Sequence, residues 1–168
     1  MDATPFPVEG GCSCGAARYR MLAAPIVVHA CHCSWCQRET GSAFVLNAMV
    51  ERDRLQLLVD PAALELVATP SASGKGQRII RCGTCKVALW SHYPGGGSAI
   101  AFVRVGTLDT PNAAPPDIHI YTSTKQAWLQ LPPDARAFAE FYDPQREWSA
   151  QSRERYRAAK VAAAAARD

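Results

Sequence analysis

Short apolar stretches recur along the whole chain, and most of them are rich in β-branched and aromatic residues. Such stretches are typical of β-strands, because branched and aromatic side chains pack well on a pleated sheet. They predict strands over residues 17–21, 26–30, 44–50, 54–59, 64–68, 78–81, 87–93, 99–105 and 118–121. Clusters of Gly, Pro, Asp and Ser separate these strands at short intervals, which favours antiparallel pairing over βαβ units. The sequence therefore predicts a mostly β fold built from antiparallel sheets.

Helix is expected in a few places. Residues 34–40 are predicted to form one helical turn, and residues 133–141 a short helix after a proline. Residues 146–168 are dense in Ala, Arg and Glu without Gly or Pro, and they predict a longer C-terminal helix. Its final turns are almost entirely alanine, so its end is either a frayed tail or an arm that docks on the domain or on a second copy. Residues 71–77 and 93–98 are predicted connections, the second a hairpin loop.

Length and composition indicate one domain with one core. The chain has 168 residues, of which 48% are hydrophobic, and a second independent domain would leave both halves thin. The formal net charge of +3 is too small and too dispersed to indicate nucleic-acid binding. The N-terminal stretch lacks the features of a secretory signal, and no apolar run reaches the roughly 20 residues of a membrane span. We therefore expect a cytoplasmic protein without a membrane partner, in which thiols stay reduced.

Seven cysteines are the most informative residues in the chain, and an odd number cannot all form disulfides. In an extended segment the side chains at positions i and i+2 share one face, and a Cys-x-x-Cys turn also brings two sulfurs together. The motifs "CSC" and "CGTC" therefore predict a four-cysteine structural zinc site formed by Cys12, Cys14, Cys82 and Cys85. The alternative is that these residues are reduced, buried cysteines that only pack in the core.

The motif C-x-C-x-x-C leaves three further cysteines, Cys31, Cys33 and Cys36, for a second zinc ion. A zinc ion with three protein ligands keeps one coordination position open, as catalytic zinc sites do. We interpret these cysteines as a catalytic site whose fourth position belongs to the substrate. Two zinc ions per chain are thus expected, with the catalytic one bound more weakly and partly occupied.

A histidine could instead close the shell and make a second structural site of the Cys3His type. His29 lies two residues before Cys31, on the same face of the predicted strand, and is the strongest rival. The side chain of His32 should point away from the neighbouring cysteines. His92 and His119 are further candidate ligands. The two interpretations differ in whether the site can accept an external ligand.

Three thiolates give the second site a formal charge of about −1, so a bound water would be acidified less than at a site of neutral histidines. A soft ligand such as a substrate thiolate suits this site better, which points to making or breaking a carbon–sulfur bond. Arg38 follows the three cysteines by two positions, and we expect it either to bind a substrate carboxylate or to be a solvated cation. Ser42 is expected to be a turn hydroxyl or to hydrogen-bond a site ligand.

The order of the cysteine motifs, with "CHCSWCQRETGS", "RCGTC" and "IHIYTSTKQAW", resembles the glutathione-dependent formaldehyde-activating enzyme family, a group that includes centromere protein V. The resemblance covers roughly residues 8–141. It implies a β-tent-like fold with one four-cysteine structural zinc and one three-cysteine site. It also implies condensation of formaldehyde with glutathione to S-(hydroxymethyl)glutathione. Lys125 and Trp128 lie in a matching segment and are candidate substrate contacts, with packing in the fold as the alternative role of Trp128. Gln37 departs from the pattern, since relatives often carry a basic residue there.

These observations predict a zinc-binding domain over residues 1–145 and a helical extension over residues 146–168. The expected function is that of a zinc-dependent carbon–sulfur lyase or synthase that acts on a thiol–aldehyde adduct, with a small thiol such as glutathione as partner. The alternative is a non-catalytic binding module with two structural zinc sites, in which the basic C-terminal helix is the interaction arm or an oligomer contact. Glu147 and Glu154 interrupt the basic residues of that helix, which favours a solvated face.

Overall fold

Two β-sheets form the body of the protein, which a computed structural model describes over residues 6–166. The small sheet has the strand order β1-β2-β5, with bounds β1 (Val8–Gly11), β2 (Arg18–Met21) and β5 (Leu55–Leu57). The large sheet has the order β10-β3-β4-β9-β8-β7-β6, with bounds β10 (Ile118–Ile120), β3 (Val27–Cys31), β4 (Val45–Glu51), β9 (Ile100–Arg104), β8 (Ala88–His92), β7 (Gln77–Cys82) and β6 (Leu64–Thr69). The mostly β prediction is confirmed.

Strand pairing is antiparallel throughout both sheets except between β10 and β3, which run parallel. All the predicted strands occur, and the loop at 93–98 joins the antiparallel neighbours β8 and β9 as expected. Strand β1 was not predicted, because its sequence VEGG contains two glycines, which have low β-propensity. It forms because β2 pairs with it along its whole length.

The two sheets enclose the main hydrophobic core between them. Tyr19 of β2 is fully buried and meets Trp90 of β8 edge to face, with ring centroids 5.9 Å apart. Val28, Ala48 and Val103, on adjacent strands of the large sheet, belong to the same buried cluster. Because side chains alternate along a strand, the residues next to these in sequence project from the opposite face of the large sheet. That opposite face carries the candidate site.

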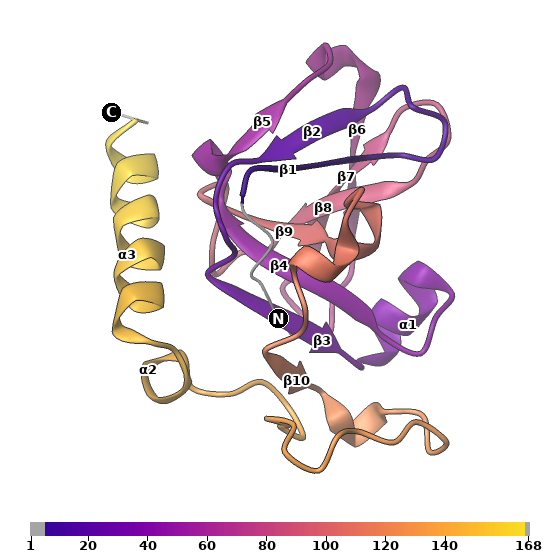
Figure 1. Ribbon diagram of the computed structural model, residues 1–168, viewed down its shortest axis with the longest axis vertical. Coiled ribbons are helices and arrows are strands. Elements are labelled where there is room, and N and C mark those ends of the chain that lie inside the picture. The colour runs from indigo at the N-terminus through magenta and orange to yellow at the C-terminus, as the bar shows by residue number, and fades with distance from the viewer. Residues whose placement is uncertain (1–5, 167–168) are drawn as a thin grey trace.

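The helices are short apart from the last one. They are α1 (Ser34–Thr40), α2 (Pro144–Glu147) and α3 (Ala150–Ala165), with single 3-10 turns η1 (Arg52–Arg54), η2 (Pro61–Ala63), η3 (Val105–Thr107), η4 (Pro111–Ala113) and η5 (Thr122–Thr124). In Figure 1, α3 stands along one side of the sheets, while α1 lies at the lower end of the opposite side. The predicted turn at 34–40 is confirmed as α1. None of the helices in residues 6–166 combines the length and hydropathy that crossing a membrane requires.

The short helix predicted over residues 133–141 is wrong. This segment runs alongside β10 instead: His119 donates its backbone N–H to Arg136 (2.8 Å), and Phe138 donates to His119 (3.0 Å). Ala137 thereby forms a parallel bridge with His119. The open edge of β10 supplies partners for the backbone groups of this segment, and these hydrogen bonds outweigh the helix propensity of its alanines.

The predicted C-terminal helix is interrupted near its start. Ser149 adopts an extended conformation and caps α3, accepting a hydrogen bond from the backbone N–H of Ser152 (3.0 Å). The chain therefore turns between α2 and α3 rather than continuing as one helix. Residues 167–168 of the prediction lie outside the described residues, and the domain boundary at residue 145 stays a prediction.

Helix α3 docks on the sheets through one face. Ser152 Oγ donates to the carbonyl oxygen of Ile26 (2.9 Å), and Tyr156 Oη donates to that of Gly95 (2.8 Å). Arg155 forms two hydrogen bonds with the Glu51 carboxylate, both 2.7 Å long. Over its described residues the helix is thus a docked arm.

Arg155→Ala should lower the free energy of unfolding by about 1–3 kcal/mol, because Glu51 would lose its charge-assisted partner at a nearly buried position. The Arg155 and Glu51 side chains are 26% and 11% exposed. Arg157 and Glu154 form a pair on the same helix whose side chains are 66% and 65% exposed, so Arg157→Ala should cost well under about 1 kcal/mol. Urea titration of both variants measures the difference, and equal losses would contradict a specific anchoring role for Arg155.

Candidate metal centres

The first cysteine cluster consists of Cys12, Cys14, Cys82 and Cys85, whose sulfur atoms all lie within 4.8 Å of one another. The Sγ atoms of Cys14 and Cys82 are 3.8 Å apart. Four ligands around a tetrahedral zinc with bonds of about 2.3 Å have about this sulfur–sulfur spacing. No disulfide joins the seven cysteines. The donor set and spacing therefore fit one structural zinc ion.

Backbone amides point at the sulfurs of this cluster. Ala17 donates to Cys12 Sγ (3.3 Å), and Thr84 donates to Cys82 Sγ (3.4 Å). Hydrogen bonds of this kind favour the thiolate, which is the form that binds metal. Cys12 follows β1 of the small sheet, and Cys82 ends β7 of the large sheet. A metal at this site would therefore clamp the two sheets together.

The second cluster contains Cys31, Cys33 and Cys36, again with all sulfurs within 4.8 Å of one another. Cys31 is the last residue of β3, Cys33 is the N-cap of α1, and Cys36 lies in the first turns of that helix. The Sγ of Cys33 accepts a hydrogen bond from the backbone N–H of Cys36 (3.3 Å). Gly41, in a left-handed conformation with φ of 63°, ends α1 and lets the chain turn back into β4. The tight strand–helix connection thus gathers the three thiols, all of them buried.

Electrostatics in this cluster favour a bound cation. Hydrogen bonds from Cys31 and Cys36 lower the pKa of Cys33, while the hydrogen bond with Cys33 raises the pKa of Cys31. Buried thiols this close together cannot all ionise unless a positive charge lies among them. A zinc ion would supply that charge, so the cluster fits a metal held by three thiolates.

The four histidines do not complete this cluster, since within residues 6–166 the metal-ligating groups found around it are the three thiols alone. His29 Nε2 is 2.6 Å from Tyr142 Oη, and burial lowers the pKa of His29 to about 4. His32 points away as expected, with its Nε2 2.9 Å from Nδ1 of His119. His92 Nδ1 hydrogen-bonds the carbonyl oxygen of Ile100 (2.7 Å). Each histidine has another partner, so the closed Cys3His arrangement finds no support in the geometry.

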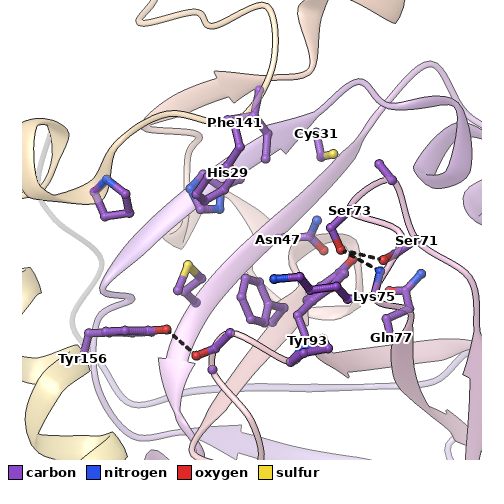
Figure 2. Close-up of a pocket in the computed structure, with 18 of the residues that line it drawn as sticks. His29, Cys31, Asn47, Ser71, Ser73, Lys75, Gln77, Tyr93, Phe141 and Tyr156 are labelled. Atoms are coloured by element: carbon purple, nitrogen blue, oxygen red, sulfur yellow. Dashed lines mark hydrogen bonds between the residues drawn. The ribbon is translucent and has the colours of Figure 1, made fainter.

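A cavity of about 960 Å³ opens beside the three cysteines, all of which line it. Its floor is the outer face of the large sheet, where His29 of β3 pairs directly with Asn47 of β4. Figure 2 shows these two side chains and Cys31 on neighbouring strands, with Lys75 across from them on the 71–77 loop. Residues of α3 form the far wall. The open side of the cysteine cluster therefore faces a space large enough for a small-molecule ligand.

Asn47 and Arg104 were not predicted as site residues. Arg104 of β9 is 5% exposed and donates hydrogen bonds to Oδ1 of Asn47 and to Oγ of Ser91 (2.8 Å). Arginine has donors only, so the Asn47 amide oxygen must face Arg104 and its NH2 group must point elsewhere. Asn47 also lines the cavity, on the strand that pairs with the one ending at Cys31. A single polar residue in the otherwise apolar predicted strand 44–50 was the available signal.

The predicted substrate contacts lie outside the cavity lining. Arg38 is exposed on α1, one turn after Trp35, whose ring borders the cavity. Lys125 Nζ donates to the carbonyl oxygen of Leu129 (2.6 Å), and Trp128 is 68% exposed. Their roles stay predictions. Gln37, the residue that departs from the family pattern, instead ties α1 to this segment by donating to the carbonyl oxygen of Thr124 (2.9 Å).

The chain is similar to a known protein family, to a bacterial protein and to a protein of solved structure. A family model described as glutathione-dependent formaldehyde-activating enzyme matches residues 7–124. A protein of Halomonas elongata with the name "Putative glutathione-dependent formaldehyde-activating enzyme" is 25% identical over 151 residues, which cover 86% of this chain and 95% of that protein. A crystal structure of a Rhodobacter sphaeroides protein is similar with a TM-score of 0.46 and 20% identity, and the match covers 60% of this chain and 87% of the other.

Proposed function

The chain belongs to the glutathione-dependent formaldehyde-activating enzyme family, and from that premise we propose that it is a zinc-dependent carbon–sulfur lyase or synthase acting on a thiol–aldehyde adduct. The observation that carries this proposal is the second cysteine cluster. It offers three buried thiols, no histidine closes it among the described residues, and it opens into a cavity. A purely structural site would close its fourth position with a protein ligand.

Cys31, Cys33 and Cys36 would hold the catalytic zinc, and Cys12, Cys14, Cys82 and Cys85 the structural one. A zinc ion at the open site would supply a Lewis acid that keeps a thiol deprotonated near neutral pH. The reaction then forms a bond between the thiol sulfur and the carbonyl carbon of an aldehyde. The carbonyl electron pair moves to oxygen, which takes up the proton that the thiol has released. The reverse reaction breaks the same bond.

Asn47 is proposed to donate a hydrogen bond to the carbonyl oxygen as negative charge develops on it. The amide oxygen of Asn47 accepts the hydrogen bond from Arg104, which leaves its NH2 group for another partner, and Asn47 lines the cavity. A donor that is held in place before the reaction stabilises such charge without having to reorganise. Arg104 acts as the positioning residue. Arg38, Lys125 and Trp128 lie outside the cavity lining and remain proposed contacts for parts of the thiol that extend beyond the cavity.

The function is tested by mixing zinc-loaded protein with glutathione and formaldehyde and following the adduct by NMR exchange spectroscopy. We expect a faster exchange of the adduct that is lost after zinc removal and restored by adding zinc. A panel of thiols and aldehydes extends the test. If no pair gives zinc-dependent turnover and no thiol binds, the non-catalytic module replaces the enzyme.

Asn47→Asp should lower kcat by about 10²–10³, the range for loss of one donor to a developing oxyanion. Aspartate keeps an acceptor for Arg104 but has no NH2 group, so the variant should fold and retain both zinc ions. Asn112→Asp, an exposed change in η4, is the matched control and should leave kcat unchanged. An Asn47→Asp variant with two zinc ions and the parent kcat would remove Asn47 from the proposed mechanism.

A further inference from the structure

The cavity extends well beyond the three-cysteine cluster. Its volume of about 960 Å³ is near the upper end of the roughly 300–1,000 Å³ found for small-molecule sites. In the view of Figure 2, Cys31 and Tyr156 lie at opposite ends, with Asn47 and Lys75 between them. A one-carbon aldehyde would fill only a small part of this space. The remainder is available for a larger group on the substrate.

Apolar side chains make up much of the cavity surface. Met49 and Phe102 lie on the sheet side. Three of the large apolar side chains that are exposed in the described part of the chain border the same cavity, namely Trp35 (39%), Phe141 (49%) and Val161 (64%). Exposed apolar groups gathered around one opening are typical of a surface that a ligand covers. The geometry thus favours an apolar occupant.

The charged residues of the lining are mostly cationic. They are Lys75, Arg153, Arg157 and Lys160, against the single carboxylate of Asp143. Two of the arginines are already paired: Arg153 donates to the carbonyl oxygen of Trp148 (2.5 Å), and Arg157 binds Glu154. Lys160 Nζ lies 5.5 Å from the centroid of the Tyr156 ring, and Lys75 Nζ shows no hydrogen bond within residues 6–166. These two ammonium groups are available to an anion.

The two sides of helix α3 have different roles. One side docks on the sheets, and the other forms the far wall of the cavity. Ser152 and Arg155 hold it to the sheets. Arg157, Lys160 and Val161, spaced three and four residues apart, line the cavity. The 71–77 loop brings Lys75 to the same cavity from between β6 and β7. The apolar and cationic character of this end therefore comes from segments far apart in the sequence.

We propose that the cavity accepts an anionic, amphipathic adduct whose apolar part is larger than a one-carbon unit, so that the substrate class is the thiol adduct of an apolar aldehyde. This inference rests on the proposed function. The thiol sulfur bonds to the carbonyl carbon, the carbonyl electron pair moves to oxygen, and the thiol proton ends on that oxygen. The apolar chain lies along Met49, Phe102 and Val161, and the carboxylates of the thiol partner meet Lys75 and Lys160.

Binding of two unreactive probes to the zinc-loaded full chain tests the proposal. S-methylglutathione and S-hexylglutathione carry the same carboxylates and differ in alkyl length alone. Isothermal titration should show a Kd for the hexyl probe at least about 30-fold lower, which corresponds to burial of about half of the added methylene groups. Trp35 and Trp148 line the cavity, so quenching of tryptophan fluorescence gives an independent readout.

Matched variants test whether the alkyl chain of the hexyl probe binds in this cavity. Val161→Asp should abolish most of the preference for the hexyl probe, while Leu66→Asp should preserve it, because Leu66 is 54% exposed but lies on β6 outside the lining. Lys75→Ala should raise the Kd of both probes about tenfold, because each probe would lose a charge-assisted contact. Arg54→Ala removes an exposed cation outside the lining and should change neither Kd.

The outcomes separate this inference from the proposed function. Zinc-dependent turnover of formaldehyde together with equal Kd values for the two probes would overturn the inference and leave the function standing. A strong hexyl preference that Val161→Asp removes would support the cavity assignment even if no thiol–aldehyde pair turned over. A hexyl preference that survives Val161→Asp would also overturn it, since the alkyl chain would then bind elsewhere.

Discussion

Replacing Cys85 with serine should yield insoluble or unfolded protein. The change removes one of the four thiols that join the turn after β1 to the end of β7, and with it the proposed zinc clamp between the sheets. Structural zinc in small peptides contributes roughly 10–16 kcal/mol of apparent binding free energy, which is comparable to the typical 5–15 kcal/mol stability of a whole domain. Solubility, the thermal melting transition and zinc per chain measure the effect.

Ser13→Ala is the matched control for Cys85→Ser, because Ser13 lies between two of the same ligands and carries no thiol. This variant should melt at the parent temperature with the parent zinc content. A Cys85→Ser protein that kept its zinc and its melting temperature would show that the four thiols are free cysteines rather than metal ligands.

Cys36→Ser should behave differently, giving a soluble, folded protein with about one zinc ion fewer per chain and no turnover. A site with an open coordination position does not join the two sheets: Cys31, Cys33 and Cys36 all lie within one β3–α1 segment. Its metal therefore contributes little to holding distant parts of the chain together. Zinc counting, a melting curve and the adduct exchange assay follow the three expected changes.

Ser42 is exposed in the turn after α1 and lies outside the cavity lining, so Ser42→Ala is the control for Cys36→Ser and should retain both zinc ions and turnover. The division of roles between the clusters would be wrong if Cys36→Ser collapsed as severely as Cys85→Ser while it retained the parent zinc content. It would also be wrong if Cys36→Ser lost one zinc ion and kept full activity.

The strands and the cysteine clusters were predictable because they depend on local spacing. Alternation of apolar residues fixes a strand locally, and Cys-x-Cys or Cys-x-x-Cys places two sulfurs together whatever the rest of the fold. The four thiols of Cys12, Cys14, Cys82 and Cys85 could be grouped because a structural zinc ion takes four ligands and each of the two motifs supplies two. The prediction of an open site followed from the three cysteines that remained, and the sulfur atoms of Cys31, Cys33 and Cys36 do lie together.

Two of the features that were missed depend on tertiary contacts. Residues 133–141 contain good helix formers, but the edge of β10 offered their backbone better hydrogen bonds. The role of Asn47 depends on Arg104, which is more than fifty positions away and reaches it through the pairing of β4 with β9. Local sequence propensity does not indicate which distant residues become hydrogen-bond partners in the fold.

The sequence indicated substrate contacts near the cysteines, such as Arg38. The structure brings cations to the cavity from two distant segments instead, Lys75 on a loop and Lys160 on the docked helix α3. An alanine-rich helix such as α3 docks or frays depending on anchors such as the pair of Arg155 and Glu51. The sequence pattern of the helix does not indicate which strand supplies the residue that anchors it. The cavity therefore has positive charge even though Gln37 stands where relatives often carry a basic residue.

The most direct test of the open zinc site is an anomalous-scattering map at the zinc edge, from crystals of zinc-loaded protein soaked with a thiol. The account predicts two zinc peaks per chain. One lies among Cys12, Cys14, Cys82 and Cys85, and the other lies about 2.3 Å from each of the other three sulfurs with the thiol's sulfur as its fourth ligand. A second peak closed by a protein side chain before and after soaking, or no second peak in zinc-saturated crystals, would contradict the account.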